Sequence, residues 1–261
     1  MTCQQIIELL EQHSPTEYAE SWDNVGLLAG RREKEVHKVM AALDATDAVI
    51  RQAVKAGADM LLTHHPLLFL AKKSVTTDDM EGLRLIRLIQ NDISCYAMHT
   101  NFDVCGMAEM TEQKLGLKGA EILEVTRCLE NGTQIGLGRI GELPSEMTLE
   151  ELAEYVKQQF DLDHVRISGD RKAVIRRAAV CGGSGKSVVD SALKAGADVL
   201  ISGDFGHHTV LDAQAEGLCM IDAGHFGTEK MFVPYIVQYL TEKCTDVEIV
   251  AANERSPFTV I

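Results

Sequence analysis

Two stretches of this chain repeat one another, and the repeat restricts the possible folds more than any other feature of the sequence. Residues 53–63, Ala-Val-Lys-Ala-Gly-Ala-Asp-Met-Leu-Leu-Thr, match residues 192–202, Ala-Leu-Lys-Ala-Gly-Ala-Asp-Val-Leu-Ile-Ser. Each stretch has the pattern of a helix end, a glycine that stops the helix, and a short buried strand. Chance similarity is the alternative, but five identical consecutive residues disfavour it. We therefore expect an α/β protein built from two related lobes.

The rest of the chain supports the α/β class, because strand and helix patterns alternate almost throughout. Capping boxes at Thr2/Gln5 and Thr148/Glu151 predict two helix starts, the second helix running to about residue 160. Strands are expected at 39–43, 60–63, 94–98 and 218–222, and further helices at 47–56 and 80–90.

The expected lobes divide the chain unevenly. Residues 1–124 with 225–261 form the first lobe, which carries most of the candidate ligands, and residues 125–224 form the second. No linker rich in proline or serine separates them, so we expect close packing.

Composition excludes several classes of protein. The 261 residues are 46% hydrophobic and 25% charged, which is typical of a globular protein, and no apolar run is long enough for a membrane span. The net charge of -14, without a basic cluster, argues against direct binding of duplex nucleic acid. The seven cysteines lack Cys-x-x-Cys spacing and the N-terminus lacks a signal-peptide pattern, so we expect reduced thiols and a cytoplasmic location.

Adjacent histidines, His64 and His65, follow the predicted strand at 60–63 and precede Pro66. Open α/β sheets bind ligands at the carboxyl ends of their strands, so a structural role is the less favoured alternative for this pair. Neighbouring side chains on extended backbone point to opposite sides. The two imidazoles are therefore better placed to serve two metal ions than to hold one together.

Two further strand ends carry residues of ligand type. His99 and Asp103 follow the strand at 94–98, where a polar turn is the alternative explanation. His225 and Glu229 follow the strand at 218–222 and share one face if that segment is helical. Alternatively, Thr228 caps a helix that begins at Glu229.

These residues predict a site for two divalent ions. The expected metal ligands are His64, His65, Asp103, His225 and Glu229. His64 with Asp103 would hold one ion, His65 with His225 the other, and Glu229 would bridge them. Mixed nitrogen and oxygen ligands suit zinc, iron, manganese or cobalt without selecting one. A pair of such ions activates water and polarises a substrate oxygen. His99 is a further ligand, a donor to a ligand, or a proton carrier.

Three loops have weaker signals. Trp22, the single tryptophan, is equally suited to anchor the core or to stack on a substrate. The run Cys-Gly-Gly-Ser-Gly-Lys at 181–186 follows a strand, so its amides are candidates for binding an anion. Asp204, His207 and His208 are candidates to approach the site, although surface or capping roles are slightly favoured.

Taken together, these segments resemble the NIF-three-like family, dinuclear-metal hexameric proteins often labelled GTP cyclohydrolase I type 2-like. The matching segments are Trp-Asp-Asn-Val-Gly-Leu at 22–27, Gly-Ala-Asp-Met-Leu-Leu-Thr-His-His-Pro-Leu at 57–67, His-Thr-Asn-Phe-Asp at 99–103, 181–185, 203–208, and Gly-His-Phe-Gly-Thr-Glu at 224–229. The family's metal ligands fall on the same five residues, and His99 matches a histidine that lines the same cleft. The resemblance implies two interlocked α/β domains and a toroidal homohexamer whose metal sites face an inner cavity.

Two functions are consistent with this pattern. The first is a metal-dependent hydrolase acting on a nucleotide or another phosphorylated, anionic small molecule, with Glu229 and His99 as candidate catalytic residues; the family label points to GTP. The second is a non-catalytic hexamer that stores metal, delivers it or regulates a partner. Turnover that needs Glu229 distinguishes the first function from the second.

Overall fold

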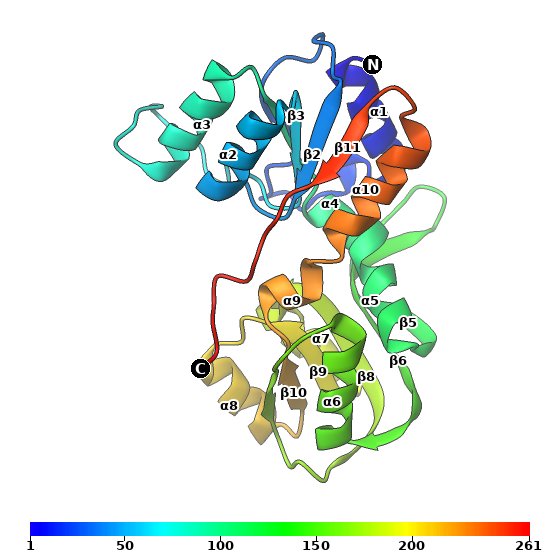
Figure 1. Cartoon of the computed structure of the whole chain (residues 1–261). Helices are drawn as coiled ribbons and strands as arrows, with labels where there is room; N and C mark the ends of the chain where they lie inside the picture. The colour runs from blue at the N-terminus through cyan, green and yellow to red at the C-terminus, as the bar shows by residue number, and fades with distance from the viewer. The chain divides into compact units, whose positions relative to one another are not determined.

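The computed structural model describes residues 1–261, and the chain divides into two compact units, each with its own mixed sheet (Figure 1). Unit 1 is Met1–Phe102 with Lys230–Pro257, and unit 2 is Asp103–Glu229 with Phe258–Ile261. Residues 103–124, 225–229 and 258–261, which we expected in the first lobe, belong to unit 2.

Unit 1 is a sheet flanked by helices, and its elements follow in chain order. They are α1 (Cys3–His13), η1 (Thr16–Tyr18), β1 (Gly26–Ala29), β2 (Lys38–Ala42), α2 (Asp47–Ala56), β3 (Met60–Thr63), α3 (Met80–Gln90), β4 (Ser94–Ala97), α4 (Thr100–Phe102), α10 (Phe232–Lys243) and β11 (Glu248–Ala251).

The sheet of unit 1 has the strand order β1-β4-β3-β2-β11. Strands β11, β2, β3 and β4 are parallel, and β1 is an antiparallel edge strand. Residues from α2 and α3, including Val49, Ile50, Leu85 and Leu88, form one apolar core with this sheet. Because β2, β3 and β4 run the same way, their carboxyl ends meet at one edge, where His64, His65 and His99 follow.

Unit 2 contains a larger sheet, and its elements also follow in chain order. They are η2 (Asp103–Met107), a π-helical turn, then α5 (Ala108–Leu115), β5 (Lys118–Cys128), β6 (Gln134–Thr148), α6 (Leu149–Phe160), β7 (Arg166–Ser168), β8 (Val174–Ser184), η3 (Gly185–Val188), α7 (Val189–Lys194), β9 (Val199–Gly203), α8 (His207–Ala215), β10 (Cys219–Asp222) and α9 (His225–Glu229).

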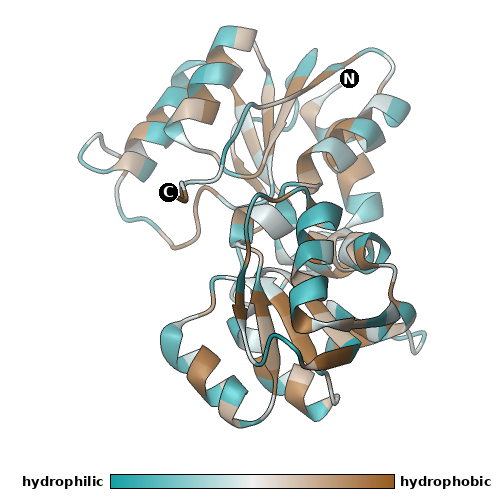
Figure 2. Ribbon diagram, turned by 60° about the horizontal axis from the view of Figure 1, so that its bottom comes forward, coloured by the Kyte–Doolittle hydropathy of each residue, from teal (hydrophilic) through white to brown (hydrophobic).

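The sheet of unit 2 has the strand order β5-β6-β8-β9-β10-β7. Strands β8, β9 and β10 are parallel, whereas β5, β6 and β7 pair antiparallel with their neighbours. Helices α7 and α8 share an apolar core with this sheet, and strands of both sheets are largely hydrophobic in Figure 2. None of the helices combines the length and apolar character that a membrane crossing requires.

The predicted elements are confirmed. The helix at 47–56 has the expected bounds, and Gly57 ends it in the left-handed conformation with φ 65°. The strand at 60–63 also has the expected bounds, those at 94–98 and 218–222 differ by one residue at one end, and the strand predicted at 39–43 is shifted by one residue to 38–42. Both capping boxes form, at Thr2 and at Thr148.

The two Lys-Ala-Gly-Ala-Asp stretches adopt the same local structure. In unit 1, the Asp59 carboxylate accepts hydrogen bonds from the backbone amides of His37 (2.7 Å) and Lys38 (3.0 Å), at the start of β2. In unit 2, Asp198 accepts the equivalent bonds from Arg176 and Arg177, at 2.9 and 2.8 Å. Each aspartate directly precedes one parallel strand and joins the start of that strand to the neighbouring parallel strand.

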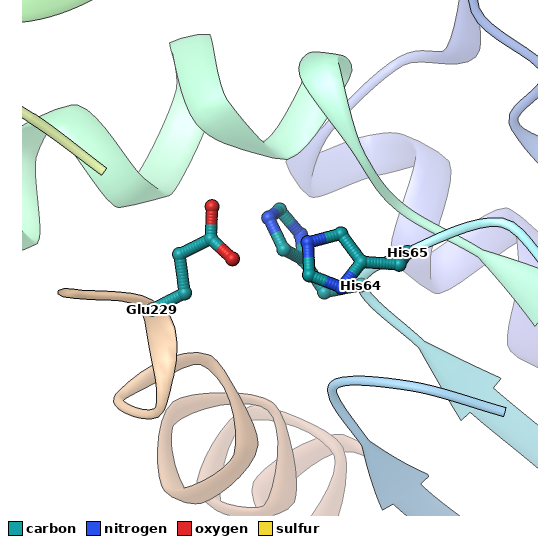
Figure 3. Close-up of side chains that lie close together, drawn as sticks. All are labelled: His64, His65 and Glu229. Carbon is teal, nitrogen blue, oxygen red and sulfur yellow. The ribbon is translucent and has the colours of Figure 1, made fainter. Parts of the chain in front are cut away.

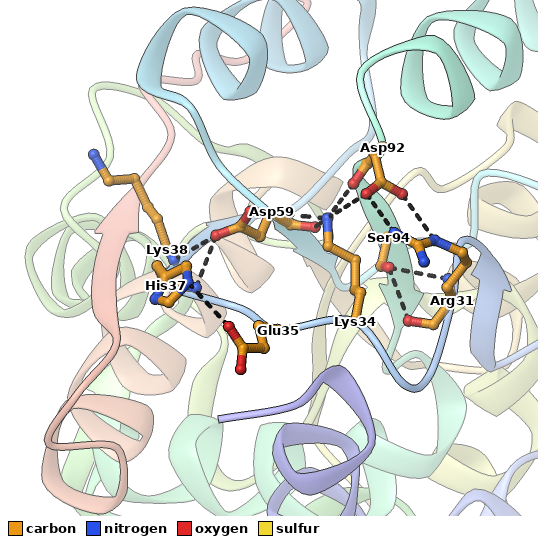
Figure 4. Close-up of polar contacts among 8 residues, drawn as sticks. All are labelled: Arg31, Lys34, Glu35, His37, Lys38, Asp59, Asp92 and Ser94. Atoms are coloured by element: carbon orange, nitrogen blue, oxygen red, sulfur yellow. Dashed lines mark hydrogen bonds and ion pairs between the residues drawn. The ribbon is translucent and has the colours of Figure 1, made fainter.

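Lys34 extends this linkage across the sheet of unit 1 (Figure 4). Its buried ammonium donates to the backbone carbonyls of Asp59 and Asp92, the residues before β3 and β4, and forms ion pairs with both carboxylates. Arg31 forms a second ion pair with Asp92 at 2.7 Å. The amino ends of β2, β3 and β4 are therefore tied together by charged groups.

This linkage predicts a measurable stability cost. Asp59→Ala and Asp198→Ala should each lower the free energy of unfolding by about 2 kcal/mol, because each removes a charged acceptor of two backbone hydrogen bonds. Asp59→Asn should cost less, since its amide oxygen still accepts. Chemical unfolding followed by circular dichroism measures the loss, and equal stability of Asp59→Ala and Lys55→Ala, an exposed control, would contradict the assigned role.

Candidate metal centre

Unit 1 supplies two of the predicted ligands, and the ladder of its sheet positions both. The backbone amides of His64 and His65 donate to the carbonyls of Ala42 and Leu43, so the pairing with β2 continues past the end of β3. His64 is completely buried, and the His65 side chain is 21% exposed. The centroids of the two imidazole rings lie 4.9 Å apart.

Each of these imidazoles is held through its Nδ1 atom. His64 Nδ1 lies 2.7 Å from the Met98 carbonyl oxygen, and His65 Nδ1 lies 2.9 Å from Asp44 Oδ1. A carbonyl and a carboxylate only accept hydrogen bonds, so Nδ1 is the protonated nitrogen in both rings. This leaves Nε2 with the lone pair, which is the arrangement that metal-binding histidines adopt.

Two phenylalanines place the His64 ring beside the points where the chain leaves and re-enters unit 1. Phe102, the last residue of the first segment of unit 1, has its ring 6.1 Å from that of His64. Phe232, at the start of α10, has its ring 5.1 Å from it. In the sequence, the predicted ligand Asp103 follows Phe102 by one residue, and Glu229 precedes Phe232 by three.

Unit 2 supplies the other three predicted ligands. Asp103 opens the π-helical turn η2, a backbone form that often occurs at functional sites. His225 and Glu229 begin and end α9, so the predicted helical turn is confirmed, and the alternative in which Thr228 caps a helix from Glu229 is wrong. The Thr228 hydroxyl instead donates to the His225 carbonyl at 2.9 Å.

His225 and Glu229 form a charged pair. His225 Nε2 lies 3.1 Å from Glu229 Oε2, and its Nδ1 lies 2.9 Å from Asp204 Oδ2. Burial lowers the pKa of His225, but the hydrogen bonds and charges of Glu229 and Asp204 outweigh it and raise that pKa to about 9. Two donor atoms 3.1 Å apart can both bind one ion at the usual distance of about 2.1 Å.

The glycine run after Cys181 makes room for this pair. A Cβ atom on Gly183, which has φ +63°, would lie 2.2 Å from Glu229 Oε1 and 3.3 Å from His225 Nε2. The Gly183 amide donates to the Thr228 hydroxyl at 2.9 Å. The sequence suggested that the amides of this loop bind an anion, but this amide is used within the protein, and glycine is required here by the approach of a carboxylate.

Cys181 lies in the same part of unit 2. Burial first, and then the nearby charges of Asp103 and Glu229, raise the pKa of the Cys181 thiol well above its usual range. The thiol therefore stays protonated at neutral pH in the absence of metal. This agrees with a donor set of imidazoles and carboxylates.

His99, which is not one of the five predicted ligands, is also held through Nδ1. Its Nδ1 lies 2.9 Å from Asp23 Oδ1, and the Asp23 side chain is fully buried. Burial raises the pKa of Asp23, but hydrogen bonds from His99 and Thr100 outweigh it and lower that pKa to about 2. The His99 ring lies 5.4 Å from that of His64 and 5.5 Å from that of His65.

The sequence did not assign all of these partners. Asp44 follows the predicted strand at 39–43, so its place at a strand end was an available signal for its bond to His65. Asp204 was slightly favoured as a surface group, whereas it holds His225. His207 and His208 are exposed at the start of α8. The bond of His64 to the Met98 carbonyl could not be predicted from the pattern of side chains, because the acceptor is a backbone atom.

Figure 3 shows the side chains of His64, His65 and Glu229, which together are a possible metal-binding group. Each offers one atom of ligand type, an imidazole nitrogen or a carboxylate oxygen. The held Nδ1 atoms, the paired imidazole and carboxylate on α9, and the protonated thiol all fit a divalent cation bound by nitrogen and oxygen.

This geometry predicts the effect of crowding the Glu229 carboxylate. Gly183→Ala should lower the affinity for divalent metal about 10- to 100-fold, because the new methyl group displaces Glu229. Gly196→Ala is the matched control: Gly196 has φ +69°, but nothing lies within 4 Å of its added Cβ, so the backbone strain is similar and no ligand moves. Competition with a fluorescent chelator measures the affinities, and equal affinities of the two variants would contradict the prediction.

Comparisons with known proteins show the family of this chain. The Duf34/NIF3 (NGG1p interacting factor 3) family matches residues 1–257. A GTP cyclohydrolase 1 type 2 homolog of Clostridium perfringens is 37% identical over 265 residues, covering 100% of both chains.

Solved structures of related proteins superpose on nearly the whole chain. A Bacillus cereus protein related to NIF3 superposes with a TM-score of 0.94 at 28% identity, covering 100% of this chain and 99% of that one. Reduced HcgD from Methanocaldococcus jannaschii superposes with a TM-score of 0.82 at 31% identity, covering 97% and 98%. With a family match over nearly its whole length and relatives above 30% identity, this chain belongs to the Duf34/NIF3 family.

Proposed function

We propose that this chain is a metal-dependent hydrolase that acts on a nucleotide or another phosphorylated small molecule. Two divalent ions would be held by five ligands: His64, His65, Asp103, His225 and Glu229. Bound there, the ions would supply the activation of water and the polarisation of a substrate oxygen. Their positive charge would also attract an anionic substrate to a chain whose net charge is -14.

The chain's own covalent path supports the combination of ligands from both units. Phe102 and Phe232 pack against His64, and Asp103 and Glu229 lie one and three residues away from them. Both carboxylates therefore belong to residues that are close in sequence to a phenylalanine packed against the first imidazole. Glu229, with the longer side chain, is the proposed bridge between the ions.

The observation that favours catalysis over storage is the pairing of His99 with Asp23. Storage or delivery of metal needs ligands, but it does not need a third imidazole held by a buried carboxylate next to them. With Nδ1–H donated to Asp23, His99 presents Nε2 to accept and return a proton. The names of curated relatives make GTP the first substrate to test. The homohexamer implied by the family resemblance remains a prediction.

Metal content tests the proposed ligands directly. Protein purified without an affinity tag should contain close to two divalent ions per chain by elemental analysis. His65→Ala and Glu229→Gln should each lower that content, because each removes one donor. Content near zero that added metal does not restore, or content unchanged in both variants, would contradict the site.

His99 separates the two candidate functions. His99→Ala should keep the wild-type metal content and lower kcat for GTP hydrolysis about 10²- to 10⁴-fold, because only the proton carrier is lost. Chromatographic separation of the nucleotides measures the rate, with His207→Ala as an exposed control. Wild-type protein that is fully loaded with metal and turns over no nucleotide would instead favour the storage function.

A further inference from the structure

Trp22 and Phe69 form an exposed aromatic pair next to His99. The ring centroids of Trp22 and Phe69 lie 5.8 Å apart, and those rings lie 6.2 and 6.4 Å from that of His99. Large aromatic side chains are usually well covered, yet Trp22 is 57% exposed and Phe69 is 47% exposed. Trp22 is therefore not a core residue, which was one of the two roles that the sequence left open.

The loops that carry both rings are firmly held. Asp23, the neighbour of Trp22, accepts hydrogen bonds from His99 Nδ1 and from the amide and hydroxyl of Thr100. The Asn24 side-chain amide donates to the carbonyl of Leu68, next to Phe69. Two segments far apart in sequence are thus joined at the base of the pair, so the backbone beside each exposed ring is held by hydrogen bonds.

We propose that Trp22 and Phe69 are a stacking subsite for a flat aromatic heterocycle, such as the purine base of a nucleotide. At 5.8 Å apart and tilted by 53°, the two rings already touch, so nothing fits between them. The heterocycle instead stacks on the exposed indole face, with Phe69 at its edge. This inference rests on the proposed function, since it names the part of the substrate that the subsite recognises.

The neighbourhood of the pair favours a small heterocycle over an apolar protein partner. The third ring of the group is an imidazole backed by a carboxylate, and it lies against the rings of His64 and His65. A base held on Trp22 is therefore about one ring's width from His99, and its polar edge meets a hydrogen-bonding group. Stacking of a base on an aromatic side chain strengthens binding about 5- to 150-fold by itself.

The single tryptophan provides the test, because all indole fluorescence reports on this site. GTP and guanosine should quench Trp22 emission to a saturating limit, whereas inorganic tripolyphosphate should not. Phe69→Ala should weaken GTP binding about tenfold, and Phe69→Tyr should preserve it. Leu70→Ala is the matched control, an exposed apolar residue of the same loop without a ring, and it should bind GTP like the wild type.

Guanosine added to protein treated with a chelator separates this proposal from the metal site. If guanosine quenches the emission of the treated protein to saturation, and the untreated protein also contains little metal, the stacking subsite is retained and the proposed metal centre is rejected. Full metal content without quenching by GTP or guanosine would overturn the subsite alone. Equal losses in Phe69→Ala and Leu70→Ala, or emission that changes with protein concentration and not with nucleotide, would also overturn it and indicate an apolar contact between protein chains.

Discussion

The parallel pairing of β2, β3 and β4 in unit 1 is the constraint on which the candidate site depends. It brings three carboxyl ends to one edge of the sheet, and the ladder continues beyond the strands through the amides of His64, His65 and Met98. At the opposite edge, Lys34 and Asp59 fix the starts of the same strands. A slip of one strand would move the imidazoles by several ångströms relative to one another.

Much of this arrangement was predictable because it is local in sequence. The helix at 47–56, Gly57 and the strand at 60–63 follow from hydrophobic spacing and capping within a dozen residues. The carboxyl ends of neighbouring parallel strands lie at the same edge of the sheet, so His64, His65 and His99 could be predicted to lie close together. For His225 and Glu229 the sequence left two alternatives, and the structure places both residues on one helical turn, α9.

What the sequence did not predict depends on contacts between distant segments. The Met98 carbonyl that holds His64 is a backbone atom, and any residue type at that position would supply it. Asp204 has a positive φ and an exposed side chain, features of a turn residue, and only the fold brings it to His225. Gly183 lies in a run with the pattern of an anion-binding loop. A glycine that leaves space for a ligand and one that leaves space for a carboxylate of the protein look the same in sequence.

Three imidazoles lie at this edge, and their partners distinguish their roles. His64 donates from Nδ1 to a backbone carbonyl, and the lone pair on its Nε2 suits a metal ligand. His65 donates to Asp44, whose side chain is 48% exposed and screened by water. His99 donates to Asp23, which is fully buried and also held by Thr100. A buried carboxylate fixed in this way offsets the charge of a carried proton, so the ring best suited to proton transfer is the one outside the ligand set.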